Sequence, residues 1–359
     1  MRGNCLRISA LLAALGSFAG CSPPTERGAI SRDSKSPGQI ALVRGSHLYL
    51  IKPDGSAERE IASNVAEEMP IEWSRNGRFI IYSGIAQGGV SDLWAIETDR
   101  HSTTVLPANL TRLTSGVARS PAISPDSKRV AFMRDQPAGL YVLTLGSVDP
   151  PRRLTHDGQL DQIPTWSPDG KSIVYGELVF TDESAVEKFR MQLLIAKYDP
   201  ASAGVAPATP IPAGDGASDS PALSPMPSDS PYALAFRAHR RGNDEIALLD
   251  PVHLAAPEIN LTKSWADEHD PVWSPDGARL AFWRRTKTAH ELWTFRPDGT
   301  DAVQVCTLRA EPAPGPVEWS GDSRQIAFSF AHAHAGILIV ESAGGIPRRI
   351  GDGTQIKWR

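Results

Sequence analysis

TWSPDG, at residues 165–170, is the stretch that decides the fold, because related copies of it recur along the chain. Each copy places Trp or an apolar residue before Ser, then a turn, then a strand rich in β-branched and aromatic residues. Pro presets φ in such a turn, and Asp followed by Gly or Ser closes it. The six copies lie at residues 72–77, 122–127, 165–170, 222–225, 272–277 and 318–323. Such self-similarity indicates a fold built from one repeated unit.

The spacing of the copies identifies that unit. Successive copies are about 43 to 57 residues apart. After each turn strand come a second apolar segment and a short third one, which ends near Leu-Thr in residues 112–114 and 153–155. A period of about 45 to 50 residues with four strands is typical of a β-propeller blade. We therefore expect an all-β propeller of four-stranded blades over residues 38–359.

The two ends of this region complete one another. Residues 40–43, 47–50 and 59–61 have the pattern of the second, third and fourth strands of a blade that lacks its first strand. Residues 355–358, QIKW, match the first strands that end in Glu72-Trp73 and Glu318-Trp319. We expect the C-terminal strand to close the N-terminal blade, which gives seven blades and no open sheet edge at the seam. A six-blade ring is the alternative if the copy at 222–225, whose turn is expanded, is not a blade.

The first 37 residues predict export. Residues 1–20 combine a basic start, Arg2 and Arg7, with an apolar run too short to span a bilayer, as in a signal peptide. Cys21 stands where a bacterial lipoprotein carries its lipid, and Ser22 after it favours the outer membrane. Ordinary cleavage after Ala19, giving a soluble periplasmic protein, is the alternative. Residues 21–37 are rich in Ser, Pro and charge, so we expect a flexible tether.

The net charge and the cysteine content exclude some classes of partner and an intramolecular disulfide. The net charge of −4 argues against a nucleic-acid surface and against binding to anionic lipid, so we expect membrane contact through the N-terminal lipid only. With Cys5 in the signal and Cys21 lipidated, Cys306 remains alone and forms no intramolecular disulfide. We expect a monomer.

The Trp-Ser-Pro-Asp-Gly turn followed by Leu-Ala-Phe or Ile-Ala-Phe resembles the repeat of the TolB-type, WD-like β-propellers. The resemblance covers nearly all of residues 38–359 and implies a propeller fold. It is specific to that superfamily and not to one activity. The best-known member carries an additional N-terminal domain, so its partner contacts are not transferred to this chain.

Strand counting places the candidate binding residues. In a four-stranded blade, the link into the first strand and the loop between the second and third strands share one face, which opens on the central funnel. Repeated turn residues build the scaffold, so function is expected in residues that differ between copies. The candidates on this funnel face are Glu68, Asp161, Asp219, His239, His269, Asp270, His290, His332 and His334.

Two functions remain open at this point, and a purely structural envelope protein with a filled funnel is a third alternative. The first is a non-catalytic binding module of the cell envelope that recognises a protein, peptide or glycan through its funnel face. The second is a lyase or hydrolase acting on a polysaccharide or small ester, with a funnel metal held by His332 and His334 together with His269 or Asp270. No spacing signature links these residues, and the chain has no Gly-x-Ser-x-Gly elbow, so we expect no metal, no cofactor and no catalytic residue.

Overall fold

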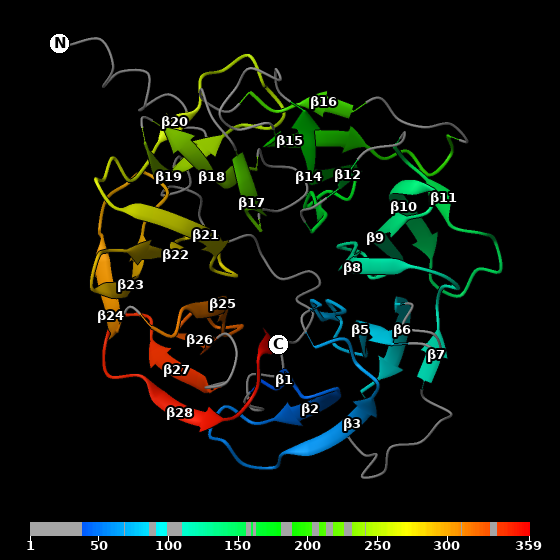
Figure 1. The fold of residues 1–359 in the computed structure, drawn as a ribbon, viewed down its shortest axis with the longest axis horizontal. Coiled ribbons are helices and arrows are strands. Elements are labelled where there is room, and N and C mark those ends of the chain that lie inside the picture. Colours follow the sequence, from blue (N-terminus) through cyan, green and yellow to red (C-terminus); the bar gives the residue numbers. More distant parts are fainter. Residues whose placement is uncertain are drawn as a thin grey trace, which may run out of the picture.

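The structure is a computed structural model, and it describes residues 38–67, 69–85, 91–98, 110–155, 159–160, 163–180, 189–202, 208–212, 218–225, 232–240, 242–309, 311–330 and 336–359. The strands of these residues form seven antiparallel sheets, which stand as blades around a common centre (Figure 1). No helix of the described part is long and apolar enough to cross a membrane.

The blades follow one another along the chain, and each runs from an inner to an outer strand. Blade 1 contains β29 (Gln355–Trp358), β1 (Ile40–Arg44), β2 (His47–Ile51) and β3 (Arg59–Ser63). Blade 2 contains β4 (Glu72–Trp73), β5 (Phe79–Ile85), β6 (Ser91–Glu97) and β7 (Leu110–Arg112). Blade 3 contains β8 (Ala118–Ile123), β9 (Arg129–Asp135), β10 (Ala138–Thr144) and β11 (Arg152–Arg153).

Blade 4 differs from the others because its inner strand is in two pieces that both pair with the second strand. It contains β12 (Gln159–Leu160), β13 (Thr165–Trp166), β14 (Ser172–Phe180), β15 (Phe189–Lys197) and β16 (Ala208–Pro210). Blade 5 contains β17 (Ser218–Leu223), β18 (Leu234–Arg240), β19 (Asn243–Leu249) and β20 (Ile259–Asn260).

The last two blades complete the ring. Blade 6 contains β21 (Asp267–Trp273), β22 (Leu280–Arg285), β23 (Ala289–Phe295) and β24 (Val303–Arg309). Blade 7 contains β25 (Pro314–Trp319), β26 (Gln325–Phe330), β27 (Ile337–Glu341) and β28 (Arg348–Gly351). The predicted seven-blade propeller is confirmed, and the copy at residues 222–225 is a blade.

The repeated Ser and Asp hold the turn that joins the first two strands of a blade. In blade 3 the Ser124 hydroxyl donates to Asp126 Oδ1 at 2.6 Å and accepts the Arg129 N–H at 3.0 Å. Asp126 Oδ1 also accepts the Lys128 N–H at 3.1 Å. Blades 2, 4, 6 and 7 repeat this arrangement. These motif residues are therefore structural, as expected from their regularity.

In blades 2, 4, 6 and 7 the repeated Trp joins the blade to the one before it. The indole Nε1 of Trp166 donates to the carbonyl oxygen of Ala122 at 3.0 Å, and Trp319 donates to Val272 O at 3.2 Å. Apolar side chains fill the space between neighbouring blades in seven clusters, one at each blade interface. The core is therefore distributed around the ring.

The seam of the ring lies in blade 1, where the two ends of the propeller region pair. β29 is antiparallel to β1, with Ile40 opposite Trp358 and Val43 opposite Gln355. The predicted composite blade is thus confirmed. On the neighbouring blade, Trp73 Nε1 donates to Lys357 O at 3.2 Å, so the indole contact found in blades 4, 6 and 7 also joins blade 2 to the C-terminal strand.

A charged contact reinforces this seam. Lys357 Nζ lies 3.1 Å from Glu72 Oε1 of blade 2 and 3.1 Å from Glu318 Oε1 of blade 7. Burial lowers the pKa of Lys357, but the two carboxylates together raise it above its ordinary value. Burial also raises the pKa of Glu318, against the opposing effect of Lys357. One ammonium group therefore ties three consecutive inner strands together.

Candidate functional site

A bulge recurs in the first strand of several blades and sets the direction of the polar side chains there. The pairing register shifts between Asp219 and Ala222 in β17 and between His269 and Val272 in β21. Within these bulges Ser220 has φ +50° and Asp270 has φ +53°. Such left-handed backbone is uncommon outside glycine and is typical of special local geometry.

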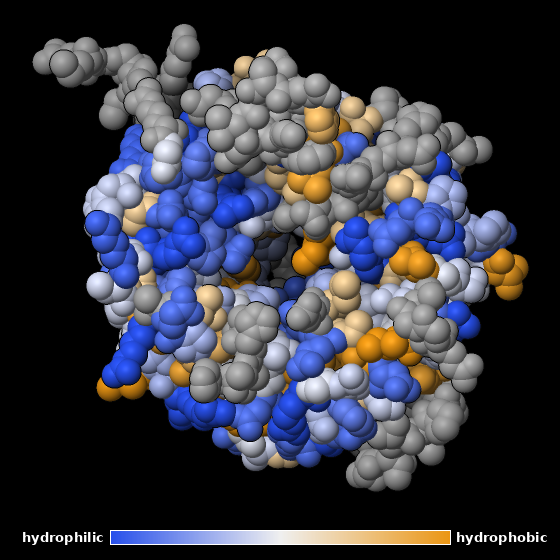
Figure 2. Space-filling model, in the orientation of Figure 1, coloured by the Kyte–Doolittle hydropathy of each residue, from blue (hydrophilic) through white to orange (hydrophobic). Residues whose placement is uncertain are grey.

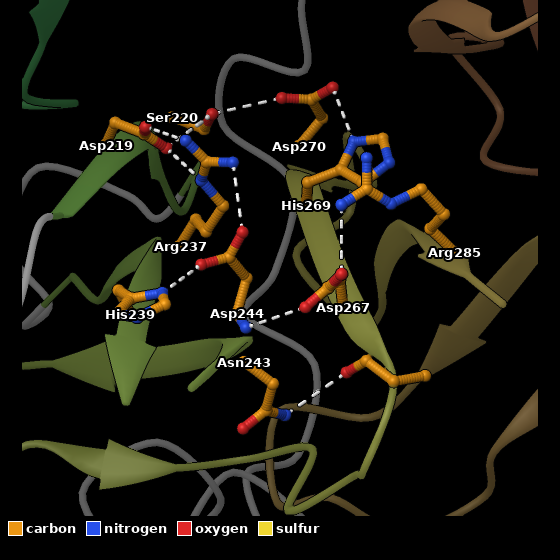
Figure 3. Close-up of polar contacts among 11 residues, drawn as sticks. Asp219, Ser220, Arg237, His239, Asn243, Asp244, Asp267, His269, Asp270 and Arg285 are labelled. Carbon is orange, nitrogen blue, oxygen red and sulfur yellow. Dashed lines mark hydrogen bonds and ion pairs between the residues drawn. The ribbon is translucent and has the colours of Figure 1, made fainter. Parts of the chain in front are cut away.

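The two bulges bring blades 5 and 6 into polar contact. The Ser220 hydroxyl donates to Asp270 Oδ1 at 3.0 Å, and His269 Nδ1 lies 2.9 Å from Asp270 Oδ2 (Figure 3). Burial tends to raise the pKa of Asp270, but hydrogen bonds from His269 and Ser220 and the charge of Arg237 lower it below its usual range. The carboxylate of Asp270 is therefore ionised and shared between two blades.

Arg237, at the centre of β18, organises the blade 5 side of the site. Its guanidinium binds both carboxylate oxygens of Asp219, with Nε 2.6 Å from Oδ1, and its Nη1 lies 3.2 Å from Asp244 Oδ2 (Figure 3). Asp219 raises the pKa of Arg237 further. Asp244 Oδ1 in turn lies 2.9 Å from His239 Nδ1.

Asp267, the first residue of β21, connects this group to blade 6. Its Oδ1 accepts the Asp244 N–H at 3.2 Å, and its Oδ2 accepts a hydrogen bond from Arg285 Nη2 at 2.9 Å. Arg285 lowers the pKa of Asp267. We call this set the blade 5–6 cluster; it comprises Asp219, Ser220, Arg237, His239, Asp244, Asp267, His269, Asp270 and Arg285.

The strand registers show that these residues share one end of their blades. Asp219 stands opposite Arg237, and His239 stands opposite Asp244 across β18 and β19. Asp267 stands opposite Arg285, which stands opposite His290. The link into the first strand and the loop after the second strand therefore meet at the same end. Figure 2 shows a hollow at the centre of the ring with hydrophilic surface over β21 and β22 beside it.

The candidates named from the sequence divide into two groups. Asp219, His239, His269 and Asp270 belong to the blade 5–6 cluster, and the ring of buried His290 lies 6.4 Å from that of His269, centroid to centroid. The others, Glu68, Asp161, His332 and His334, lie outside the described residues, as do Cys21 and the whole of residues 1–37. Within the described ranges no group of three or more His, Cys, Asp or Glu side chains is placed to hold a metal.

Sequence reasoning missed five members of the cluster: Ser220, Arg237, Asp244, Asp267 and Arg285. Arg237 carried a signal. It follows Leu234-Ala235-Phe236, and the residues in the same place of other copies are Met133, Trp283 and Ser329. A charged side chain at a position that is otherwise uncharged is the kind of difference between copies that marks a site. Asp244, Asp267 and Arg285 lie at strand ends, where charge is common and carries no such signal, and Ser220 is a small polar residue of a kind frequent in every copy.

The pairing of these groups limits their chemistry. Every carboxylate of the cluster contacts a guanidinium, an imidazole or a hydroxyl. A general acid or base needs a pKa shifted toward the working pH, and Asp267 and Asp270 are shifted the other way. The arrangement suits the recognition of a ligand by fixed, paired donors and acceptors more than proton transfer.

Comparison with known proteins supports the fold of this chain but assigns the chain to no family. No family model and no curated protein matches the sequence. Among solved structures, TolB from Acinetobacter baumannii is 17% identical with a TM-score of 0.53, over 89% of this chain and 66% of the TolB chain. The chain thus spans just under two thirds of TolB. An oligogalacturonate lyase in complex with manganese is 13% identical with a TM-score of 0.63, over 88% of this chain and 86% of that chain.

A third similar structure is a larger enzyme. Prolyl oligopeptidase B from Galerina marginata, bound to a 35mer substrate, is 13% identical with a TM-score of 0.60, over 87% of this chain and 48% of that chain. At these identities the likeness concerns the fold alone, and these proteins place one propeller architecture in quite different functional settings. The chain has a β-propeller fold similar to that of TolB.

Proposed function

We propose that this chain is a non-catalytic binding propeller of the bacterial cell envelope, which recognises a protein, peptide or glycan through the funnel face of blades 5 and 6. The observation that supports the proposal is the blade 5–6 cluster, whose charged groups are held by one another on two rigid sheets. Side chains fixed in this way lose little conformational entropy when a ligand binds. Residues 1–20 would direct export as a signal peptide. A lipid on Cys21 would then hold the ring at the outer membrane, facing the periplasm or the surface; a soluble periplasmic form is the alternative.

The binding proposal predicts that exposed members of the cluster determine what the protein retains. We expect the full-length His239→Ala/Arg285→Ala variant to capture a specific envelope component at least tenfold less than the unchanged protein does. Both side chains are at least half exposed, so their exchange is expected to leave the fold intact. The measurement is quantitative mass spectrometry of material retained from envelope extracts.

Arg349→Ala is the matched control, because Arg349 is equally exposed and ion-paired but lies on the outer strand β28. Equal capture by all three proteins would contradict a role for the cluster. Retention no greater than on bare matrix would contradict the binding function itself.

A metal-dependent lyase or hydrolase is the second candidate. Its support is the likeness to the manganese-bound oligogalacturonate lyase together with the contact between His269 and Asp270. The binding proposal predicts that purified full-length protein contains no stoichiometric metal by mass spectrometry and that its Tm does not respond to a chelator. A stoichiometric metal whose removal lowers the Tm would favour the enzyme, and lyase assays on oligogalacturonate would follow.

A further inference from the structure

Trp265 is the most exposed aromatic side chain among the large apolar residues at the surface of the described part, with 80% of the residue accessible. It lies in the link between β20 and β21, two residues before Asp267. This link lies at the same end of the blades as the blade 5–6 cluster. A tryptophan in solvent forgoes a large burial free energy, so its presentation calls for an explanation.

The backbone on both sides of Trp265 is fixed by side-chain hydrogen bonds. Asn243 Nδ2 donates to the carbonyl oxygen of Ser264 at 2.8 Å and to that of Ala266 at 3.3 Å. The Ser264 hydroxyl accepts the Ala266 N–H at 3.0 Å, and Ala266 itself is buried. The backbone that carries the exposed indole is therefore held in place by Asn243 and Ser264.

A buried carboxyl group stands beneath this link. Glu268 is fully buried, and its Oε1 accepts a hydrogen bond from Arg284 Nε at 2.9 Å. Burial raises the pKa of Glu268, while hydrogen bonds from Thr262 and Ser264 and the contact with Arg284 oppose the rise. Thr262 also accepts the Ile246 N–H through its hydroxyl at 3.1 Å. The link between β20 and β21 is thus held by hydrogen bonds to β19 and β22.

The exposed charge around Trp265 is mainly positive, although the whole chain carries a net charge of −4. Lys263 lies in the same link, and Lys287 lies in the turn that follows β22; both are exposed. Arg285, at the end of β22, keeps 58% of its side chain accessible while it pairs with Asp267. Three exposed cations thus stand at this end of blades 5 and 6, and the two most exposed carboxylates of the cluster, Asp267 and Asp270, are already paired with Arg285 and His269.

We propose that Trp265, with Lys263, Arg285 and Lys287, binds an acidic peptide segment of a partner protein. The inference rests on the proposed binding function and names the class of ligand. The indole would contact an apolar side chain of the segment, and the three cations would pair with its carboxylates. Trp and Arg dominate the binding free energy of many protein interfaces, and opposite charge speeds encounter and selects the partner. Because the backbone that carries the indole is already fixed, little backbone entropy is lost when the segment binds.

A cationic ligand fits this edge less well. The carboxylates of the blade 5–6 cluster are already engaged by Arg237, Arg285 and the two imidazoles, and the exposed groups around Trp265 are themselves cations. A cation would therefore meet like charge at the point where it contacts the indole.

The experiment selects peptides from a random library displayed on phage against the full-length protein, and then titrates the synthetic selected peptides. We expect the selected sequences to be enriched in Asp and Glu around an apolar residue. Trp265→Ala should weaken their binding at least tenfold. Lys263→Glu/Lys287→Glu should do the same at low salt, with the difference shrinking as salt is added. Because these side chains are exposed, all variants should melt as the unchanged protein does.

Val252→Ala is the matched control, because Val252 is 57% exposed in the turn between β19 and β20, at the other end of blade 5. It should bind the peptides as the unchanged protein does. Selection of no peptide, of peptides without acidic enrichment, or of peptides that bind Trp265→Ala equally well would overturn the inference. So would Trp265-dependent binding to vesicles of anionic phospholipid in place of peptides. If the inference fails while His239→Ala/Arg285→Ala still reduces capture from envelope extracts, the proposed function stands without it.

Discussion

Removal of residues 355–359 is expected to abolish cooperative thermal unfolding and to leave the chain aggregation-prone. The deletion takes away all four pairing positions of β29, the buried side chains of Ile356 and Trp358, and the ammonium of Lys357. Loss of one large buried aromatic costs about 3 to 5 kcal/mol, and the total stability of a domain is only about 5 to 15 kcal/mol. The edge of β1 would also be exposed to pairing with other chains. Calorimetry and light scattering measure both effects.

A rearranged chain is the control for this deletion. The Arg359 N–H donates to Gln39 O at 3.0 Å, so the end of β29 lies beside the start of β1. A chain ordered 1–37, 355–359, 38–354 retains every residue and places β29 before β1 as an ordinary hairpin. It should melt close to the original chain. If the deletion variant melts like the original chain, pairing of β29 with β1 is not needed for stability. If the rearranged chain, which has the same composition, does not fold, the effect of the deletion cannot be assigned to the loss of this pairing.

Exchange of Lys357 for Met is expected to destabilise the ring by about 3 kcal/mol at neutral pH, or roughly 5 °C in Tm. The substitution keeps the length of the side chain and removes the charge that stands between Glu72 and Glu318. Two carboxylates then face one another in a partly buried position with no counter-charge. Thermal unfolding of the variant and of the unchanged protein, followed over a range of pH, measures the difference.

The pH dependence of that difference distinguishes charge from packing. Burial raises the pKa of Glu318 in the folded protein, and the loss of Lys357 would raise it further. A carboxyl with a raised folded pKa favours the fold below its unfolded pKa of about 4.3 and loses that contribution as pH rises through the folded pKa. The penalty of Lys357→Met should therefore shrink in acid. In Lys357→Met/Glu72→Gln/Glu318→Gln the loss of stability should be small at every pH. A loss of stability that does not change with pH in either variant would refute the electrostatic account.

The fold was predictable because its determinants are local and repeated. The turn at residues 165–170 specifies its own hydrogen bonds through Ser167 and Asp169. Because the motif occurs six times, a departure from it in one copy does not hide the repeat. Closure of blade 1 was predictable for the same reason, since QIKW at 355–358 matches other first strands. Even the expanded copy keeps its blade, because Ser224 accepts the Ala233 N–H at 2.9 Å across a longer turn.

The site was predictable only in part, because it depends on contacts between blades. Topology alone brought Asp219, His239, His269 and Asp270 to one end of two blades. The central position of Arg237 depends on the shape of the bulge in β17, which no local pattern specifies. The presentation of Trp265 depends on Asn243, which is distant in sequence, so no local pattern marks this residue. Pairwise geometry of this kind becomes visible only in three dimensions.

The seam also determines the order in which this ring can be completed. Ile40 and Trp358 are partners in one sheet, yet nearly the whole propeller separates them along the chain. Contacts between such distant residues are slow to form. A ribosome, or a secretion channel, releases the start of blade 1 long before its inner strand. Until then β1 has no inner neighbour, so the newly made chain would pass through an open-ended stage in which a chaperone that covers strand edges has the most to protect.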